Sequence, residues 1–214
     1  MSETSTSDIL LFVNSSEADY KVINRFLLDA STPDAGPGAD YTWHVALQRN
    51  PTFFADEPET TQPGSDGLDG IDFDNPWAGA SISEIEAFAF QAQICVRSGL
   101  ILILDDKGVE DEIVIVAERA VVYEDGEGTV EERQRVLDEF KKVRVPRLDV
   151  VNVAMNLWVA NMGFEEFTTS FSEGTFRGGW YEYRAESMSR ETKRAEKRRE
   201  REPLFKQLQE QGLV

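Results

Sequence analysis

The fold class is predicted most directly from the stretch LILILDDKGVEDEIVIVAERAVVY, residues 100–123. Its first five residues are all apolar, which predicts a β-strand buried on both faces. The segment DDKGVED has the composition of a turn, and the apolar residues of 112–123 predict another strand or a bulged pair. A strand with two buried faces needs cover on both sides of its sheet, so we expect an α/β or α+β protein.

Upstream of this stretch the apolar pattern alternates between strand and helix. Residues 9–13 form an apolar run of strand length, and NSS at 14–16 supplies N-cap candidates for the helix that follows. Residues 41–48 alternate between apolar and polar side chains, which predicts a strand. Residues 81–99 predict a second helix, in which Ser83 and Glu86 have capping-box spacing.

Downstream of the stretch we expect a helix and a short edge strand. Thr129 and Glu132 repeat the capping-box spacing, and the apolar residues after them predict a helix to about Lys142. The segment VRV before Pro146 is short enough for an edge strand. The complete order of elements predicts a single mixed β-sheet flanked by helices.

Residues 49–79 form a long acidic loop that contains four prolines. Loops of this length are commonly lids or surface segments. Its large aromatic side chains either form a binding patch or fold the loop onto the body, and we expect the second: Phe53, Phe54, Phe73 and Trp77.

The C-terminal residues 184–214 are dense in charge and low in apolar side chains, which predicts a charged helical tail interrupted near Pro203. We expect it to be loosely docked or free, beside a globular domain over 1–183. The chain's net charge is −18; the tail has nine basic and six acidic residues (net +3) and the body thirteen and thirty-four (net −21). Such a tail should dock weakly on the body at low salt.

Charge and composition also limit which kinds of partner and which cellular compartment we expect. A body this acidic repels phosphate backbones and anionic lipids, so we expect no membrane contact and no nucleic acid beyond weak binding through the tail. No apolar run is long enough to span a bilayer, and the N-terminus lacks the pattern of a secretory signal. A single cysteine, Cys95, fits a reducing compartment. We therefore expect the cytosol or the nucleus.

The stretch NLWVANMGFEEF, residues 156–167, places two carboxamides in an apolar run. Leu157 to Ala160 fit a short strand bracketed by Asn156 and Asn161, whose side chains can satisfy backbone groups where a strand meets a helix. A second short helix is expected from near Gly163, with Glu165 and Glu166 in its first turn, where carboxylates favour the helix dipole. The alternative use of the asparagines is ligand binding.

With FRGGW, which begins at Phe176, this stretch resembles the C-terminal signature of a family of uncharacterised domains from actinobacteria and fungi. The family pattern is N-L-x-x-A-N-M-x-F-x-x-F, followed by F-R-G. The resemblance covers roughly residues 143–180 and implies a fold unit without a reaction. A longer acidic middle, the basic tail and Gly163 depart from the family pattern.

If the first three strands are parallel, residues 14–16, 49–50 and 105–106 converge at one sheet edge, where open α/β folds bind ligands. Asp105 belongs to that set. Arg177 in FRGG offers a bidentate contact to a carboxylate or phosphate, or a structural pair with Glu165 or Glu166. These residues and the two asparagines are the candidate site for a small ligand or a reaction.

Motifs for catalysis are sparse. The one histidine, His44, lies on a predicted strand, the sequence has no G-x-S-x-G, and SEGTFRGG lacks phosphate-loop spacing. DGLDGIDFDN lacks the spacing of a calcium loop, so we expect no metal and no cofactor. The preferred hypothesis is a non-enzymatic protein that acts through contacts with an unknown protein partner. The alternatives are a small-ligand binder or enzyme, and an accessory protein in a fungal metabolic pathway.

Overall fold

The computed structural model describes residues 9–30, 43–50, 61–65, 67–71, 73–92, 99–123, 134–158, 161–169, 179–184 and 189–214. Its helices are α1 (Tyr20–Asp29), α2 (Ile82–Ala92), α3 (Asp106–Asp111), α5 (Val150–Trp158) and α6 (Ser189–Glu210), with the 3₁₀ turns η2 (Arg147–Asp149) and η3 (Phe164–Glu166). Its strands are β1 (Leu10–Val13), β2 (His44–Val45), β3 (Leu100–Leu104), β4 (Ile113–Tyr123), β5 (Gln134–Pro146), β6 (Thr168–Thr169) and β7 (Trp180–Tyr183).

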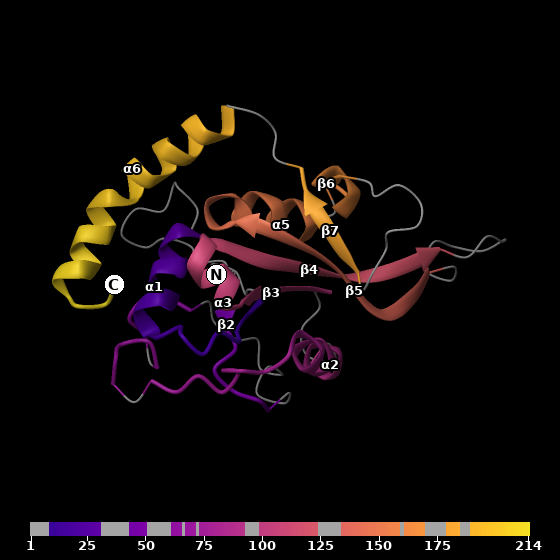
Figure 1. The fold of residues 1–214 in the computed structure, drawn as a ribbon, viewed down its shortest axis with the longest axis horizontal. Helices are drawn as coiled ribbons and strands as arrows, with labels where there is room; N and C mark the ends of the chain where they lie inside the picture. The colour runs from indigo at the N-terminus through magenta and orange to yellow at the C-terminus, as the bar shows by residue number, and fades with distance from the viewer. Residues whose placement is uncertain are drawn as a thin grey trace, which may run out of the picture.

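The strands form one mixed sheet in the order β2-β1-β3-β4-β5-β7-β6, which confirms the predicted fold class (Figure 1). The first three strands are parallel, which meets the condition for residues 14–16, 49–50 and 105–106 to lie at one sheet edge. β4 and β5 are a long antiparallel hairpin with a register shift between Arg119 and Val121, so the apolar run 113–123 is one strand with an irregularity.

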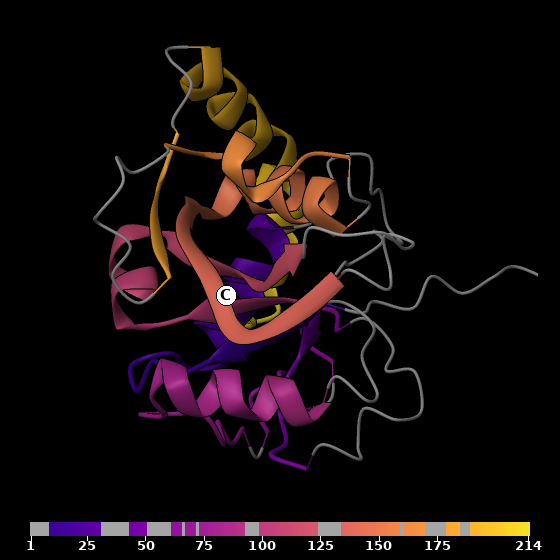
Figure 2. The same cartoon turned by 90° about the vertical axis from the view of Figure 1, so that its right-hand side faces the viewer.

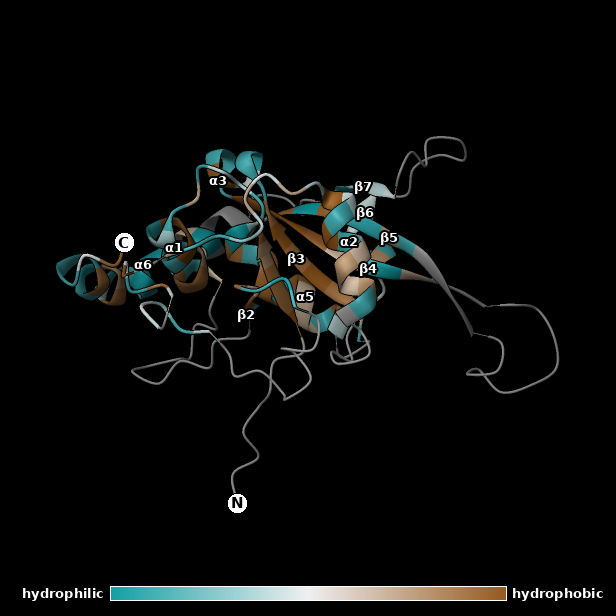
Figure 3. Cartoon of the chain, turned by 90° about the horizontal axis from the view of Figure 1, so that it is seen from below, coloured by the Kyte–Doolittle hydropathy of each residue, from teal (hydrophilic) through white to brown (hydrophobic). Residues whose placement is uncertain are grey.

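Alternate residues of the central strands point to opposite faces, and each face has its own core. Leu11, Val13 and Leu102 pack with α1 and α5, whereas Phe12 and Ile103 pack with α2. Figure 2 accordingly shows α2 on one side of the sheet and α5 on the other. In Figure 3 the hydrophobic strands lie in the centre and the largely hydrophilic α6 lies at the periphery. Burial of β3 on both faces is thus confirmed, since all five of its residues are buried.

The predicted helix up to Lys142 is wrong where the structure describes it, because residues 134–146 form β5. The local capping pattern favours a helix here, but the neighbouring strand β4 needs a hydrogen-bonded partner strand. β4 has eleven residues, and its backbone groups need a partner strand along their length. Pairing from Ile113 with Pro146 to Tyr123 with Gln134 supplies that partner. The VRV segment is therefore the end of a strand between β4 and β7, and not an edge.

The predicted strand over 157–160 is also wrong, because Leu157 and Trp158 are the last residues of helix α5. The buried residues of α5 recur at helical spacing: Val150, Val153, Ala154 and Leu157. Burial of this stripe against the sheet outweighs the modest helix propensity of valine and asparagine. The helix expected after Gly163 is a single 3₁₀ turn, which buries Phe164 and leads through buried Phe167 into β6.

Several helix starts differ from the predicted positions. The N-cap of α1 is Asp19, whose carboxylate accepts from the Val22 N–H, and not NSS at 14–16. The capping box of α2 joins Ser81 and Glu84, two residues before the predicted pair. The predicted turn DDKGVED contains the short helix α3, which Asp105 caps. Asx and Ser residues are frequent in this chain, so spacing alone does not select the cap.

The tail forms one continuous helix, α6, which passes through Pro203 without the expected interruption. It packs against α1 and η2, and Figure 1 shows it along the outer side of α1. None of the helices within the described ranges is long and apolar enough to cross a membrane.

Candidate functional site

The sheet has one point at which its direction of winding reverses. The chain leaves β1 for β2 on one side and returns to β3 on the other, with Val13 aligned with Leu104. Ligands of open α/β sheets bind outside the carboxyl ends of the strands at such a point. Two of the three segments expected to converge there are in contact: the Ser15 hydroxyl donates to Asp106 Oδ1 at 2.6 Å, and Asn14 N–H donates to the Leu104 carbonyl. In the third segment, Arg49 contacts Pro76 and Trp77.

Asp105, at the carboxyl end of β3, is engaged in two structural interactions. Both of its oxygens accept from the Arg144 guanidinium, at 2.9 and 2.6 Å, and Oδ1 also accepts from the Gly108 N–H at 2.8 Å as the cap of α3. Partial burial raises the pKa of Asp105, but Arg144 and the Gly108 N–H outweigh burial and hold that pKa below its ordinary value. The carboxylate is therefore charged and positions Arg144.

The segment 73–81 closes over the same end of the sheet. Asn14 Nδ2 donates to the Ala80 carbonyl at 2.9 Å, Gly79 N–H donates to the Asn14 carbonyl at 2.9 Å, and Asn75 Nδ2 donates to the Ser15 carbonyl at 3.3 Å. Of the polar groups that converge here, Asn14 Oδ1 is buried and has no hydrogen-bond partner among the residues that the structure describes.

Trp77 anchors this closing segment. It is 2% exposed, and its ring meets Phe12 and Phe88 edge-on at centroid distances of 5.1 and 4.7 Å. The Arg49 guanidinium lies over the indole ring, 4.6 Å from its centroid, and donates to the Pro76 carbonyl. Trp77 folds the loop onto the body, as predicted, and so does Phe73, which packs beside Tyr20. Phe53 and Phe54 lie outside the described residues.

Asn156 and Asn161 close the C-terminal end of α5. Asn156 Nδ2 donates to the Asn152 carbonyl at 2.7 Å, and Asn161 Nδ2 donates to Asn156 Oδ1 at 2.8 Å. Asn161 N–H also donates to the Asn156 carbonyl at 3.0 Å, the long-range bond of a Schellman-type helix end. The two side chains thus bond to each other, and the Asn156 side chain also bonds to the backbone of the helix.

Glu165 and Glu166 have different partners. Glu165 forms an ion pair with Lys141 at 2.6 Å, whereas Glu166 accepts from the Gly163 N–H at 3.0 Å. Arg177, proposed as a partner for either, lies outside the described residues. Lys141 is aligned with Glu118, and Glu118 with Leu100, so this pair lies beside the amino end of β3. Asp105 lies at the other end of that strand, roughly 16 Å away at about 3.3 Å per residue. The structure does not bring Asp105 and Glu165 together.

Lys141, Glu118 and Glu165 form a small cluster of titratable side chains beside the amino end of β3. Burial raises the pKa of Glu118; Lys141 opposes this rise and Glu165 adds to it. Burial lowers the pKa of Lys141, but Glu165 and Glu118 outweigh burial and hold that pKa above its ordinary value. Across the described part of the chain, no group of three or more His, Cys, Asp or Glu residues could hold a metal ion.

A series of polar contacts joins α6 to the body. Basic and then apolar residues of α6 recur on one helical face, which we call the basic stripe: Arg194, Lys197, Arg198, Arg201, Phe205 and Leu208. Glu196, Glu200 and Arg199 lie on the exposed side. The interspersed glutamates thus segregate from the stripe once the helix forms.

Each half of the basic stripe meets a defined part of the body. Arg194 donates to Asp149, Lys197 Nζ donates to the Leu148 carbonyl at 2.7 Å, and Arg198 donates to Glu112 at 2.6 Å. Phe205 packs under the Arg25 guanidinium at 4.2 Å, and Leu208 is buried. Full burial of a large apolar side chain such as Leu208 stabilises by about 1.5–3 kcal/mol, more than an exposed ion pair at about 0–1 kcal/mol, and half-buried Phe205 adds part of such a contribution.

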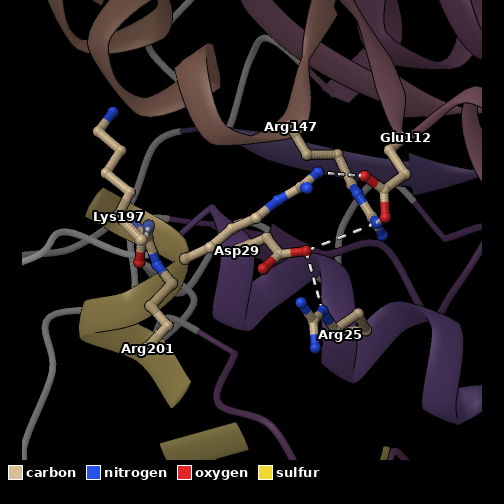
Figure 4. Close-up of polar contacts among 7 residues, drawn as sticks. Arg25, Asp29, Glu112, Arg147, Lys197 and Arg201 are labelled. Atoms are coloured by element: carbon tan, nitrogen blue, oxygen red, sulfur yellow. Dashed lines mark hydrogen bonds and ion pairs between the residues drawn. The ribbon is translucent and has the colours of Figure 1, made fainter. Parts of the chain in front are cut away.

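Beneath the basic stripe lies a buried carboxylate, Asp29, whose side chain is 5% exposed (Figure 4). It accepts from Arg25 at 3.0 Å and forms an ion pair with Arg147 at 3.5 Å. Arg147 also donates to Glu112 at 2.8 Å, so Glu112 bridges Arg147 of η2 and Arg198 of α6. Burial lowers the pKa of Lys197 and of Arg201, with Asp149 opposing the fall at Lys197 and Asp29 opposing it at Arg201.

Asn24 anchors the far end of the tail and was not a sequence candidate. It is fully buried on α1; Nδ2 donates to the Leu68 and Leu213 carbonyls, each at 2.9 Å, and Oδ1 accepts from the Gly64 N–H. Its signal in the sequence is a carboxamide within an apolar helical face. The signal for the basic stripe is the three-and-four spacing of basic residues between 194 and 201.

These features define an α+β domain with one mixed sheet and a charged C-terminal helix docked against α1 and η2. The chain belongs to the family described as Domain of unknown function (DUF6924), whose model matches residues 54–179. That range contains the NLWVANMGFEEF stretch and leaves β1, α1 and α6 outside. No match was found among curated proteins or among solved structures.

Proposed function

We propose that this protein is a non-enzymatic domain that acts through contacts with a partner protein. The observation that carries the proposal is the closure of the sheet's switch point. Asn14, Ser15 and Asp105 lie where an open α/β fold would hold a small ligand, and their side chains bond instead to Ala80, Asp106 and Arg144.

The charge distribution supports a contact function. Residues 1–183 carry thirteen basic and thirty-four acidic residues, which favours encounter with basic protein surfaces. The docked α6 offers a detachable surface, because the first half of its stripe is held mainly by polar groups at Asp149, Leu148 and Glu112. The acidic loop 49–79 and the tail are the proposed contact regions.

Affinity capture from the native host cell tests this function. The baits are the full chain, an Arg194→Glu/Arg198→Glu variant that loosens α6, and an Arg199→Glu control with the same kind of charge change on the exposed face. A protein retained reproducibly by the full chain or the loosened variant, with the Arg199→Glu bait behaving as the full chain does, supports the proposal. A small molecule converted by the full chain, with turnover abolished by Arg177→Ala, contradicts it.

A small-ligand binder or enzyme is the second candidate. Two observations favour it. Asn14 Oδ1 is buried at the switch point without a donor among the described residues, so it could accept a hydrogen bond from a ligand. Burial raises the pKa of Glu118 beside Lys141, so the Glu118 carboxyl could act as a proton donor. Mass spectrometry of small molecules bound to the native protein, repeated with Arg177→Ala and Glu118→Gln, separates this candidate from the first.

Finer assignments rest on the resemblance and on composition. We propose that N-L-x-x-A-N-M-x-F-x-x-F with F-R-G is the signature of this family, that its range includes actinobacteria and fungi, and that the protein works in the cytosol or the nucleus. An accessory role in a fungal metabolic pathway is a narrower form of the same proposal. Imaging of the tagged protein in host cells tests the location.

A further inference from the structure

The face that α6 covers has the form of a binding site for a basic helix. It consists of Asp149 and the Leu148 carbonyl at one end, Glu112 and Asp29 in the middle, and the Arg25 side chain at the other end. The first part of this line therefore offers carboxylates and a carbonyl, which accept from cations, and its far end offers one guanidinium, which packs on an aromatic ring.

The residues of α6 that meet this face follow a simple rule. From Arg194 they recur at i, i+3, i+4, i+7, i+11 and i+14, and the first four are cations and the last two are apolar. This is the anchor spacing of a helix laid lengthwise in a groove. Arg199 and Glu200, one step off the stripe, are exposed.

Resting on the proposed contact function, the geometry points to a partner of defined chemistry: a helix of another protein that presents four Lys or Arg residues at i, i+3, i+4 and i+7 and two large apolar residues at i+11 and i+14. α6 occupies the face in cis and is displaced by that helix. Helix α6 therefore competes with the partner helix for this face, and its own affinity for the face sets the affinity that the partner needs in order to displace it.

Charge complementarity favours this occupant over an acidic or a neutral one. Asp29, Glu112 and Asp149 are the carboxylates of the face, and the rest of the body is also strongly acidic. Removal of α6 would leave buried Asp29 with Arg25 and Arg147 and would leave Asp149 and Glu112 without their α6 partners. A basic helix restores those pairs.

The test uses full-length protein and fluorescent peptides. The first peptide is residues 189–214; the second is an alanine-rich helix that carries only the six stripe residues at their natural spacing; the third is the second with the Arg198 position changed to Glu. Each is titrated by fluorescence anisotropy into the wild type and into a released chain with Arg194→Glu, Arg198→Glu and Leu208→Asp.

The inference predicts that the first two peptides bind the released chain and that the third binds it at least about tenfold more weakly. The wild type should bind the first two about tenfold or more weakly than the released chain does, because a tethered helix competes at an effective concentration of the order of millimolar. Changing Glu112→Lys in the released chain should abolish the preference for the second peptide over the third.

Several results would overturn the inference. They are equal binding of the second and third peptides, binding to neither chain, or a wild-type dimer that exchanges α6 between copies, since a second copy would then be the occupant. If circular dichroism shows the released chain unfolded, Arg194→Ala/Arg198→Ala in its place keeps the same comparison. A protein partner captured by the full chain, with no peptide bound, would refute this inference and leave the contact function standing.

Discussion

Replacing Asp105 with asparagine isolates the charge that holds Arg144 at the switch point. Asparagine caps a helix about as well as aspartate, so the bond from the Gly108 N–H is retained and the bidentate ion pair is lost. The pair is largely shielded, with side-chain exposures of 17% for Asp105 and 27% for Arg144. Hydrogen bonds to charged groups contribute about 1.5–3 kcal/mol, so we expect the free energy of unfolding to fall by about 2 kcal/mol and Tm by about 4–8 °C.

The pH dependence of this loss has a defined sign. The pKa of Asp105 is lowered in the folded protein, so its contribution is present above the unfolded pKa of about 3.9 and disappears as pH falls through the lower folded pKa. Urea titrations at neutral pH and in acid measure the difference between wild type and Asp105→Asn. Glu165→Gln is the control, because that carboxylate is 64% exposed and its pair with Lys141 should contribute less than about 1 kcal/mol. A loss no larger than the control's, or one that persists unchanged in acid, would show that the Asp105–Arg144 ion pair does not stabilise the fold as proposed.

Three further substitutions probe the closing segment, the tail anchor and the β5–β7 junction. Trp77→Ala should lower the free energy of unfolding by about 3–5 kcal/mol in urea titrations, since a buried indole is removed; a loss under about 1 kcal/mol would disagree. Asn24→Ala should make the C-terminus more sensitive to carboxypeptidase than the wild type, because the Leu213 carbonyl loses its donor, and equal digestion rates would argue against that anchor. Gly179→Ala should lower Tm, because φ is +76° and the new Cβ would lie 2.2 Å from the Phe140 carbonyl oxygen; an unchanged melting curve would contradict the close approach.

Burial on both faces made part of the fold predictable from the sequence. LILIL and the apolar run after Glu112 are strands because uninterrupted apolar residues suit only a central position. Residues 134–146 were misread because Thr129 and Glu132 resemble a helix start, whereas the pairing demand of β4 is a long-range property. Helix α5 was not predicted because the stretch NLWVANMGFEEF begins at Asn156, near the end of the helix. The buried residues that show its helical spacing begin earlier, at Val150.

The candidate site was predictable only where the direction of one strand determines the position of residues that follow another. Parallel strands imply that residues after β1 and β3 meet, and Ser15 and Asp106 do. The partner of Asp105 is 39 residues away on β5, a pairing that no local pattern encodes. The basic part of the stripe, in contrast, could be predicted from the sequence. The basic residues from Arg194 to Arg201 are spaced three and four apart, which places them on one face of a helix.

Backbone hydrogen–deuterium exchange of residues 194–208 tests most directly whether the basic stripe holds α6 on the body. We expect protection in the wild type and in Arg199→Glu, faster exchange in Arg194→Glu/Arg198→Glu, and faster exchange of the wild type as salt screens the ion pairs. Exchange of α6 in the wild type at the rate of a free peptide, or an equal effect of Arg199→Glu and Arg194→Glu/Arg198→Glu, would contradict this expectation.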